Sequence, residues 1–208
     1  MITMNTKREF IIKELMEEKF VEHDGEKIYL EETEDTGKSF LEFQLESKEN
    51  ISIKNVDKNP TQLLFFKKEK NLSMYKRVDH IIFECIEDNN WKLHLIEMKS
   101  SVGTKKWTDI KGKFRASYLL AQAIAAMLEM NIAETCMYTT YDKVSFDFAE
   151  TMPVGRRLLL GIEHIKPQDE WNGDEFGLNF GTRVKFNHMP IKMIRNAQGV
   201  LEGQFACG

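Results

Sequence analysis

Two acids and one lysine stand at the ends of two apolar segments that follow one another in the chain. Asp79 precedes the first segment, and Glu97 and Lys99 end the second. Because side chains alternate between the two faces of a strand, Glu97 and Lys99 point the same way. Two carboxylates and one ammonium that converge at a sheet edge suit a divalent cation and the water that it activates.

The register of the two segments decides whether Asp79 joins the other two residues. Its side chain shares their face only if odd-numbered residues pair with odd-numbered residues. This pairing requires a bulge, or a loop with an odd number of residues. Asp88-Asn89-Asn90 is a suitable three-residue loop, because Asn tolerates left-handed backbone angles. With that loop, Asp79 lies opposite Lys99 and diagonal to Glu97.

The Glu-x-Lys triplet is common by itself, because charged residues make up 30% of the chain. It recurs at 17–19 and 46–48, and at 109–111 if Asp is allowed in place of Glu. Only Glu97 ends a strongly apolar segment that is preceded by a second apolar segment with a leading acid. This context distinguishes Glu97 from the other candidates.

A solvated strand end is the alternative interpretation of Glu97 and Lys99, with Asp79 as an acid in a turn. The neighbouring residues Ile96 and Met98 are apolar, so this end of the strand is expected to be covered on both faces. Charged groups in a covered position need partners or a metal ion. The sequence therefore favours a functional site.

These residues resemble the core motif of the PD-(D/E)XK nuclease superfamily. In that motif an Asp, and then a Glu or Asp two residues before a Lys, lie on adjacent strands; here they are Asp79, Glu97 and Lys99. Val78 stands where the pattern has Pro. A helical pattern at about 107–130 and a strand pattern at 134–141 follow in the order of the nuclease core. The resemblance implies an α/β fold, a mixed β-sheet flanked by helices with a restriction-endonuclease-like core.

The resemblance also implies an activity and a set of roles. The expected reaction is hydrolysis of phosphodiester bonds in nucleic acid, with DNA favoured over RNA. Asp79, Glu97 and the Met98 backbone carbonyl would hold Mg²⁺ or Mn²⁺, and Lys99 would orient or help deprotonate the attacking water. Accessory residues from the neighbouring helices would be Glu14, Glu17, Glu18 and Gln122.

Two groups of cations flank the proposed site in sequence, although the net charge of the chain is −4. A basic rim around an acidic metal centre suits a polyanionic substrate. Lys111 and Arg115 share one helix face, which we predict to border the metal site. The alternative is that these cations are solvated faces. The residues expected to contact nucleic acid are Lys76, Arg77, Lys105, Lys106, Lys111, Lys113 and Arg115.

Length and composition predict a single domain over 1–208, with 42% hydrophobic residues. Its core spans about 77–141, with an N-terminal helix and β extension at 1–70 and a C-terminal extension at 142–208. Three cysteines without close spacing predict free thiols in a reducing compartment. The N-terminus lacks a signal-peptide core and no apolar segment could span a bilayer, so we expect a cytoplasmic protein without a membrane partner.

The remaining elements are less distinct. We expect a helix at 7–21, β-like pieces at 27–31, 39–45, 51–55 and 62–66, and strands at 157–162 and 178–186. The tail at 187–208 is open between an edge element, an oligomer contact and disorder, so a homo-oligomer is a possible state. The alternative function is a non-catalytic nucleic-acid-binding or protein-interaction subunit on the same fold, for example in a phage or defence system.

Overall fold

The computed structural model describes residues 6–34, 37–57, 66, 73–146, 166–173 and 175–207. The protein is a mixed α/β protein made mostly of strands, which form two mixed sheets and a short strand pair. The helical segments within these ranges are α1 (Thr6–Phe10), a π-helical turn (Ile11–Leu15), a 3-10 turn (Glu18–Phe20), α2 (Thr104–Met127) and α4 (Pro167–Asn172).

The larger sheet has seven strands in the order β1-β4-β5-β6-β8-β11-β10. β6 and β11 both run parallel to β8, which lies between them, and the other neighbours are antiparallel. The strands are β1 (Val21–His23), β4 (Asn50–Ile53), β5 (His80–Glu87), β6 (Asn90–Glu97), β8 (Asn131–Tyr141), β10 (Glu175–Asn179) and β11 (Arg183–Lys192).

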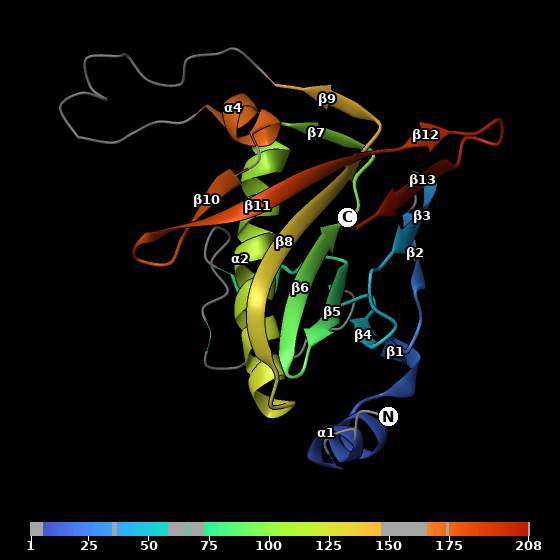
Figure 1. The fold of residues 1–208 in the computed structure, drawn as a ribbon. Helices are drawn as coiled ribbons and strands as arrows, with labels where there is room; N and C mark the ends of the chain where they lie inside the picture. Colours follow the sequence, from blue (N-terminus) through green and yellow to red (C-terminus); the bar gives the residue numbers. More distant parts are fainter. Residues whose placement is uncertain are drawn as a thin grey trace.

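Helix α2 connects β6 to β8 and packs on one face of this sheet (Figure 1). Its apolar residues recur every three or four positions, which gives one buried stripe as the sequence predicts. Trp107, Ile110, Phe114, Ala121 and Ala125 are all at most 2% exposed. They pack against the odd-numbered residues of β5 and β6. The helix begins three residues before the predicted start and ends at Met127.

A second sheet covers the opposite face of the large sheet, which was expected to be flanked by helices (Figure 1). Its strand order is β12-β13-β3-β2, and β13 runs parallel to β3. Even-numbered residues of the large sheet, among them Ile82, Ile96 and Tyr138, pack against it. The chain tail is therefore an inner strand of this sheet. The strands are β2 (Lys27–Glu34), β3 (Gly37–Gln44), β12 (Ile194–Arg195) and β13 (Leu201–Ala206).

The N-terminal segment is not the continuous helix that the sequence predicts for 7–21. The helix changes to a π-helical turn at Ile11 and stops at Met16, whose backbone is extended. Phe10 and Leu15 are 56% and 68% exposed, so the expected apolar stripe is not buried. Without that burial the helix lacks its main stabilisation, and Val21 begins a strand that pairs with β4.

Other predicted elements differ in detail. The strand expected at 178–186 is the hairpin of β10 and β11, which turns at Gly181 with a φ of +94°. The pieces expected at 62–66 and 157–162 lie outside the described residues, except for Phe66. Strands β7 (Ser101–Gly103) and β9 (Lys143–Ser145) form the short parallel pair.

Two further findings concern the cysteines and the helices. Cys85, Cys136 and Cys207 are free thiols, the first two of them buried. No helix in the described ranges combines the length and the apolar character needed to cross a membrane.

Candidate active site

The β5–β6 hairpin gives the face on which the candidate site lies. Odd residues pair with odd residues, for example Phe83 with Leu93. The predicted three-residue loop is wrong: a two-residue turn follows a bulge between Cys85 and Glu87, and Asp88 has a φ of +49°. Because of the bulge, Asp79 keeps the face that the sequence predicts. The pairing of β5 with β6 is, however, shifted by two residues from the predicted register. Continued by one pair, this register sets Asp79 opposite Glu97, and not opposite Lys99.

Glu97 is the centre of the candidate site. It ends β6 and has no exposed surface. Its Oε1 lies 2.8 Å from Lys99 Nζ and 2.7 Å from Lys113 Nζ. Among the described residues, its Oε2 has no hydrogen-bond partner. Burial raises the pKa of Glu97 to about 7, and the charge of Asp79 adds to this effect against the two lysines.

Asp79 is 2% exposed and is fixed by the main chain around it. Its Oδ2 accepts the Met98 N–H at 2.6 Å, which links the start of β5 to the end of β6. The preceding residue is anchored to α2, because the Val78 N–H donates to Ser117 Oγ at 2.9 Å. The Asp79 carboxylate is therefore held beside Glu97 by contacts on both neighbouring elements.

Lys99 has a fixed backbone and a side chain that reaches from the interior to the surface. Its N–H donates to Thr140 Oγ1 at 2.9 Å, and the Thr140 hydroxyl donates to the Lys99 carbonyl at 3.2 Å. Its Nζ donates to the Met98 carbonyl at 2.8 Å as well as contacting Glu97. The side chain is 22% exposed, so this ammonium can exchange its partners for groups in solvent.

Lys113 lies at a position that the sequence did not predict. We expected it to contact substrate phosphate, whereas the structure places its ammonium against Glu97. Lys113 lies on one flank of the buried stripe of α2, and Lys111 and Arg115 lie on the other flank. The signal in the sequence was its position three residues after the buried Ile110 and directly before the buried Phe114.

The face formed by Lys111 and Arg115 was expected to border the metal site. Lys111 instead donates to both oxygens of Glu170, at 2.9 Å and 2.8 Å. With Lys76, these two residues line a separate cavity of about 210 Å³. The structure therefore groups these three cations apart from the lysines at Glu97.

The other residues that were expected to contact nucleic acid differ in their burial and in their hydrogen-bond partners. Arg77 is 1% exposed and its Nε donates to the Val56 carbonyl at 3.0 Å, so it is not the surface cation that the sequence suggests. Burial lowers the pKa of Arg77, and the nearby Asp57 opposes this effect. Lys105 is exposed, and Lys106 Nζ donates to Ser101 Oγ at 2.6 Å.

The expected accessory residues are not brought to the site. Glu14, Glu17 and Glu18 are exposed, and none of them bonds to Asp79, Glu97, Lys99 or Lys113 within the described ranges. Gln122 is half-buried on α2, nine residues beyond Lys113 and hence about 13 Å further along the helix axis.

Oxygen ligands for a hard cation are present in this cluster. Glu97 Oε2 is buried without a partner, and Asp79 supplies a second carboxylate. The Met98 carbonyl adds a third oxygen, which faces Lys99 Nζ. Carboxylate and carbonyl oxygens are the ligands preferred by Mg²⁺ and Mn²⁺. Two lysines now supply the positive charge that a cation would bring to Glu97.

No family model matches the chain, and comparisons with curated proteins and with solved structures found no match. The chemistry of the cluster must therefore be judged from its own geometry. A buried carboxylate with one unpartnered oxygen, a second carboxylate and two lysines at the end of a strand is an arrangement that can bind a cation and act on a phosphate.

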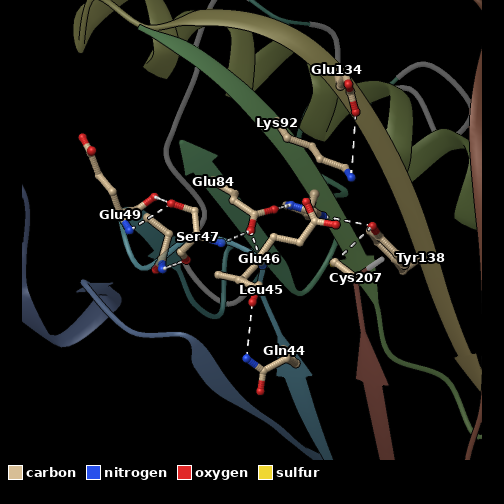
Figure 2. A network of polar contacts seen from close by, with 12 residues as sticks. Gln44, Leu45, Glu46, Ser47, Glu49, Glu84, Lys92, Glu134, Tyr138 and Cys207 are labelled. Atoms are coloured by element: carbon tan, nitrogen blue, oxygen red, sulfur yellow. Dashed lines mark hydrogen bonds and ion pairs between the residues drawn. The ribbon is translucent and has the colours of Figure 1, made fainter. Parts of the chain in front are cut away.

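A second buried polar cluster lies on the opposite face of β5 and β6 (Figure 2). Glu84 Oε1 accepts the N–H groups of Glu46 and Ser47, and its Oε2 contacts His94 Nε2 at 2.8 Å. His94 Nδ1 lies 3.0 Å from the Tyr138 hydroxyl, which lies 3.9 Å from Cys207 Sγ. The ligand atoms of Glu84, His94 and Cys207 lie within 4.8 Å of one another.

The pKa values in this second cluster follow from its burial and its hydrogen bonds. Burial alone would raise the pKa of Glu84, but hydrogen bonds from His94 and from the Ser47 and Glu46 N–H groups lower it below the usual range. Burial lowers the pKa of His94 against the opposing effect of Glu84, and it raises the pKa of Cys207 to about 11. At neutral pH these directions give an ionised Glu84, a neutral His94 and a protonated thiol.

Proposed function

We propose that this protein is a metal-dependent nuclease that hydrolyses phosphodiester bonds of nucleic acid, with DNA favoured over RNA. The observation that carries the proposal is the state of Glu97. It is a wholly buried carboxylate with one oxygen shared by Lys99 and Lys113 and the other without a partner in the described chain. Burying a charged group costs free energy, and buried titratable groups with perturbed pKa values are typical of functional sites.

The order of elements around Glu97 supports a restriction-endonuclease-like core. Strands β4, β5 and β6 run antiparallel in succession, α2 crosses one face, and β8 returns parallel to β6. The motif residues stand at the start of β5 and the end of β6. This agrees with the strand, strand, helix and strand order that the resemblance implies.

The residues present define the roles in this proposal. Asp79, Glu97 and the Met98 carbonyl would hold Mg²⁺ or Mn²⁺. When bound, the ion lowers the pKa of water and offsets charge on the scissile phosphate. Lys99 Nζ leaves Glu97 and turns toward the attacking water or the phosphate, where its charge stabilises the developing anion. Lys113, on the rigid helix, keeps the charge of Glu97 balanced.

Protonation of Glu97 sets the pH range of this site. With a pKa of about 7, the carboxyl group is neutral in mild acid and ionised in mild base. Only the ionised form is a strong ligand for a divalent cation. Cation binding and cleavage are therefore expected to rise as the pH increases from about 6 to 8.

The test is incubation of purified protein with plasmid, linear duplex and single-stranded substrates in Mg²⁺, Mn²⁺ or EDTA. Cleavage in Mn²⁺ or Mg²⁺ that is absent in EDTA and in Glu97→Gln is the expected result. Glu84→Gln serves as the matched control, because it changes another buried carboxylate on the neighbouring strand. Equal cleavage by wild type and Glu97→Gln would assign the activity to a contaminant and remove the proposal.

Burial of Glu97 also favours a second candidate, a non-catalytic nucleic-acid-binding subunit. Lys99 and Lys113 close over Glu97, and their side chains are only 22% and 20% exposed. If these two ion pairs persist with substrate, the cluster is structural. Binding of nucleic acid that is insensitive to Mn²⁺ and without cleavage would select this alternative.

A further inference from the structure

A basic groove opens beside the candidate site, on the side of the second sheet. It has a volume of about 350 Å³ and includes Met98 and Lys99 in its wall. Lys106, from the first turn of α2, lies on the same side. The groove is therefore lined both by the residues that directly follow β6 and by the first turn of α2.

The other wall is a row of residues that crosses the second sheet. Arg195 of β12 pairs with Leu201 of β13, Leu201 pairs with Ser39 of β3, and Ser39 pairs with Glu32 of β2. All four residues line the groove. Lys38 lies next to Ser39, and its exposed side chain adds a further cation. This wall is made by segments outside the core predicted from sequence.

The charge of the groove is strongly positive. Among its described lining residues, Lys38, Lys99, Lys106 and Arg195 are cations and Glu32 is the one acid. Lys99 is paired with Glu97, and Arg195 is partly neutralised, because its Nη2 lies 3.4 Å from Asp142 Oδ2. Lys38 and Lys106 form no ion pair within the described part of the chain. Serines 39 and 100 add hydroxyl donors, which also suit phosphate oxygens.

The rival cavity is less suited to an anion. Lys76, Lys111 and Arg115 line it, but Lys111 is held by both oxygens of Glu170 and Asp109 adds a second acid nearby. It also lies on the flank of α2 that faces away from Lys113 and Glu97. Cations in this cavity are therefore less able to position a phosphate at Glu97.

We propose that the strand to be cut lies in the groove of the second sheet, with its backbone phosphates on Lys38 and Lys106. This inference rests on the proposed nuclease function and gives it a substrate path. The second sheet then has a role besides covering the core. Its strands β2 and β3 from the N-terminal part and β12 and β13 from the C-terminal part build one wall of the substrate groove.

The test measures binding of a fluorescent oligonucleotide in Ca²⁺ at several salt concentrations. Each phosphate contact contributes about 0.7–0.9 to the slope of log affinity against log salt. The double variant Lys38→Ala/Lys106→Ala is therefore expected to bind more weakly, with a slope that is smaller by about 1.4–1.8. Lys48→Ala/Lys185→Ala removes the same charge from two highly exposed lysines elsewhere and is expected to keep the wild-type slope.

Three outcomes overturn the proposed path. They are a wild type that binds no oligonucleotide, a groove variant with the slope of the control, and a larger loss in Lys76→Ala/Arg115→Ala than in the groove variant. Cleavage in Mn²⁺ is measured separately on the same proteins. If wild type cleaves and the groove variant binds and cleaves like wild type, the proposed path is rejected but the nuclease function is not. If binding depends on the groove but no protein cleaves, the nuclease function is rejected but the path is not.

Discussion

Two carboxylates buried on neighbouring strands are held in opposite ways. Glu84, on β5, has both oxygens bonded, one by two backbone N–H groups and one by His94. Glu97, at the end of β6, has one oxygen paired with two partly exposed lysine side chains and the other without a partner among the described residues. Glu84 and Glu97 are equally buried, at 2% and 0% exposed. The difference between them therefore lies in their hydrogen-bond partners and not in their burial.

The two pKa shifts show what this difference means. Fixed N–H donors and His94 outweigh the cost of burial at Glu84, so its pKa lies below the usual range. At Glu97 burial and Asp79 outweigh the lysines, and the pKa rises to about 7. We interpret the fully bonded Glu84 as a residue that stabilises the fold, and we propose that Glu97 is available to a ligand.

Lys99→Ala should fold normally and lose roughly 10²–10⁴-fold in cleavage rate, the range of positioned acid–base assistance. Its Nζ contacts Glu97 and the Met98 carbonyl from a partly exposed position, and Lys113 still pairs with Glu97 in the variant, so the fold is expected to persist. Single-turnover cleavage in Mn²⁺ measures the loss, and circular dichroism checks the fold. A rate equal to that of wild type would make Lys99 a simple strand-end charge.

Glu84→Ala should lower the free energy of unfolding by about 3–5 kcal/mol, because three donors to this buried carboxylate lose their acceptor at about 1–3 kcal/mol each. The N–H groups of Glu46 and Ser47 and the ring of His94 would lose their acceptor. Urea unfolding at pH 7 provides the measurement. A loss below about 1 kcal/mol would show that Glu84 is not the structural carboxylate of this pair.

Glu97→Gln should stabilise the protein in EDTA at pH 8 but not at pH 5. With a folded-state pKa raised from 4.5 to about 7, the native state holds its proton longer, so wild-type stability falls as the pH rises through this range. The full effect is roughly 3 kcal/mol, and Gln removes the titration. Unfolding curves at both pH values test this.

The Glu84 cluster should show the opposite dependence on pH. Lowered pKa values for Glu84 and His94 mean that the unfolded state takes up protons first, so stability falls on acidification below about 6.5. A Glu97→Gln protein that becomes less stable relative to wild type as the pH rises would contradict the contrast between the two carboxylates.

Lys113→Ala should shift the acidic limb of the pH–rate profile upward by about one unit. Lys113 lies 2.7 Å from Glu97 and lowers its pKa, so its loss leaves the carboxyl group protonated to a higher pH. Lys111→Ala is the matched control, because Lys111 contacts Glu170 instead. Identical shifts in both variants would point to the general charge of the helix.

Cys207→Ala should change the free energy of unfolding by less than about 1 kcal/mol. The thiol lies 3.9 Å from the Tyr138 hydroxyl, and Glu84 and His94 are bonded without it. Purified Cys207→Ala protein should have the same zinc content and the same cleavage rate as wild type. Stoichiometric zinc that disappears with Cys207 would show that the three clustered ligand atoms form a metal site and would end the structural interpretation of Glu84.

The local patterns of the sequence predict the motif face and the main helix. Alternation in β5 and β6 gives the shared face of the odd residues, and spacing by three and four gives the buried stripe of α2. Both patterns arise from the burial of one face of a single element. The same reasoning overestimates the first helix, because Phe10 and Leu15 remain 56% and 68% exposed and are not buried against the core.

Features that depend on distant pairings were not predictable in this way. The bulge between Cys85 and Glu87 sets the register between β5 and β6, and no residue type at that position predicts a bulge. The parallel pairing of β13 with β3 joins segments more than 150 residues apart. The contact of Lys113 with Glu97 depends on how α2 is rotated on the sheet, which only the assembled core determines.

Calorimetry of Mn²⁺ binding at pH 8, in wild type, Glu97→Gln and Glu84→Gln, separates a cation ligand from a structural carboxylate. If Glu97 is kept ready for a cation and Glu84 is structural, wild type and Glu84→Gln bind Mn²⁺ with similar affinity. Glu97→Gln then loses binding. Equal Mn²⁺ affinity in wild type and Glu97→Gln, or loss of binding in Glu84→Gln alone, would show that Glu97 is not the cation ligand.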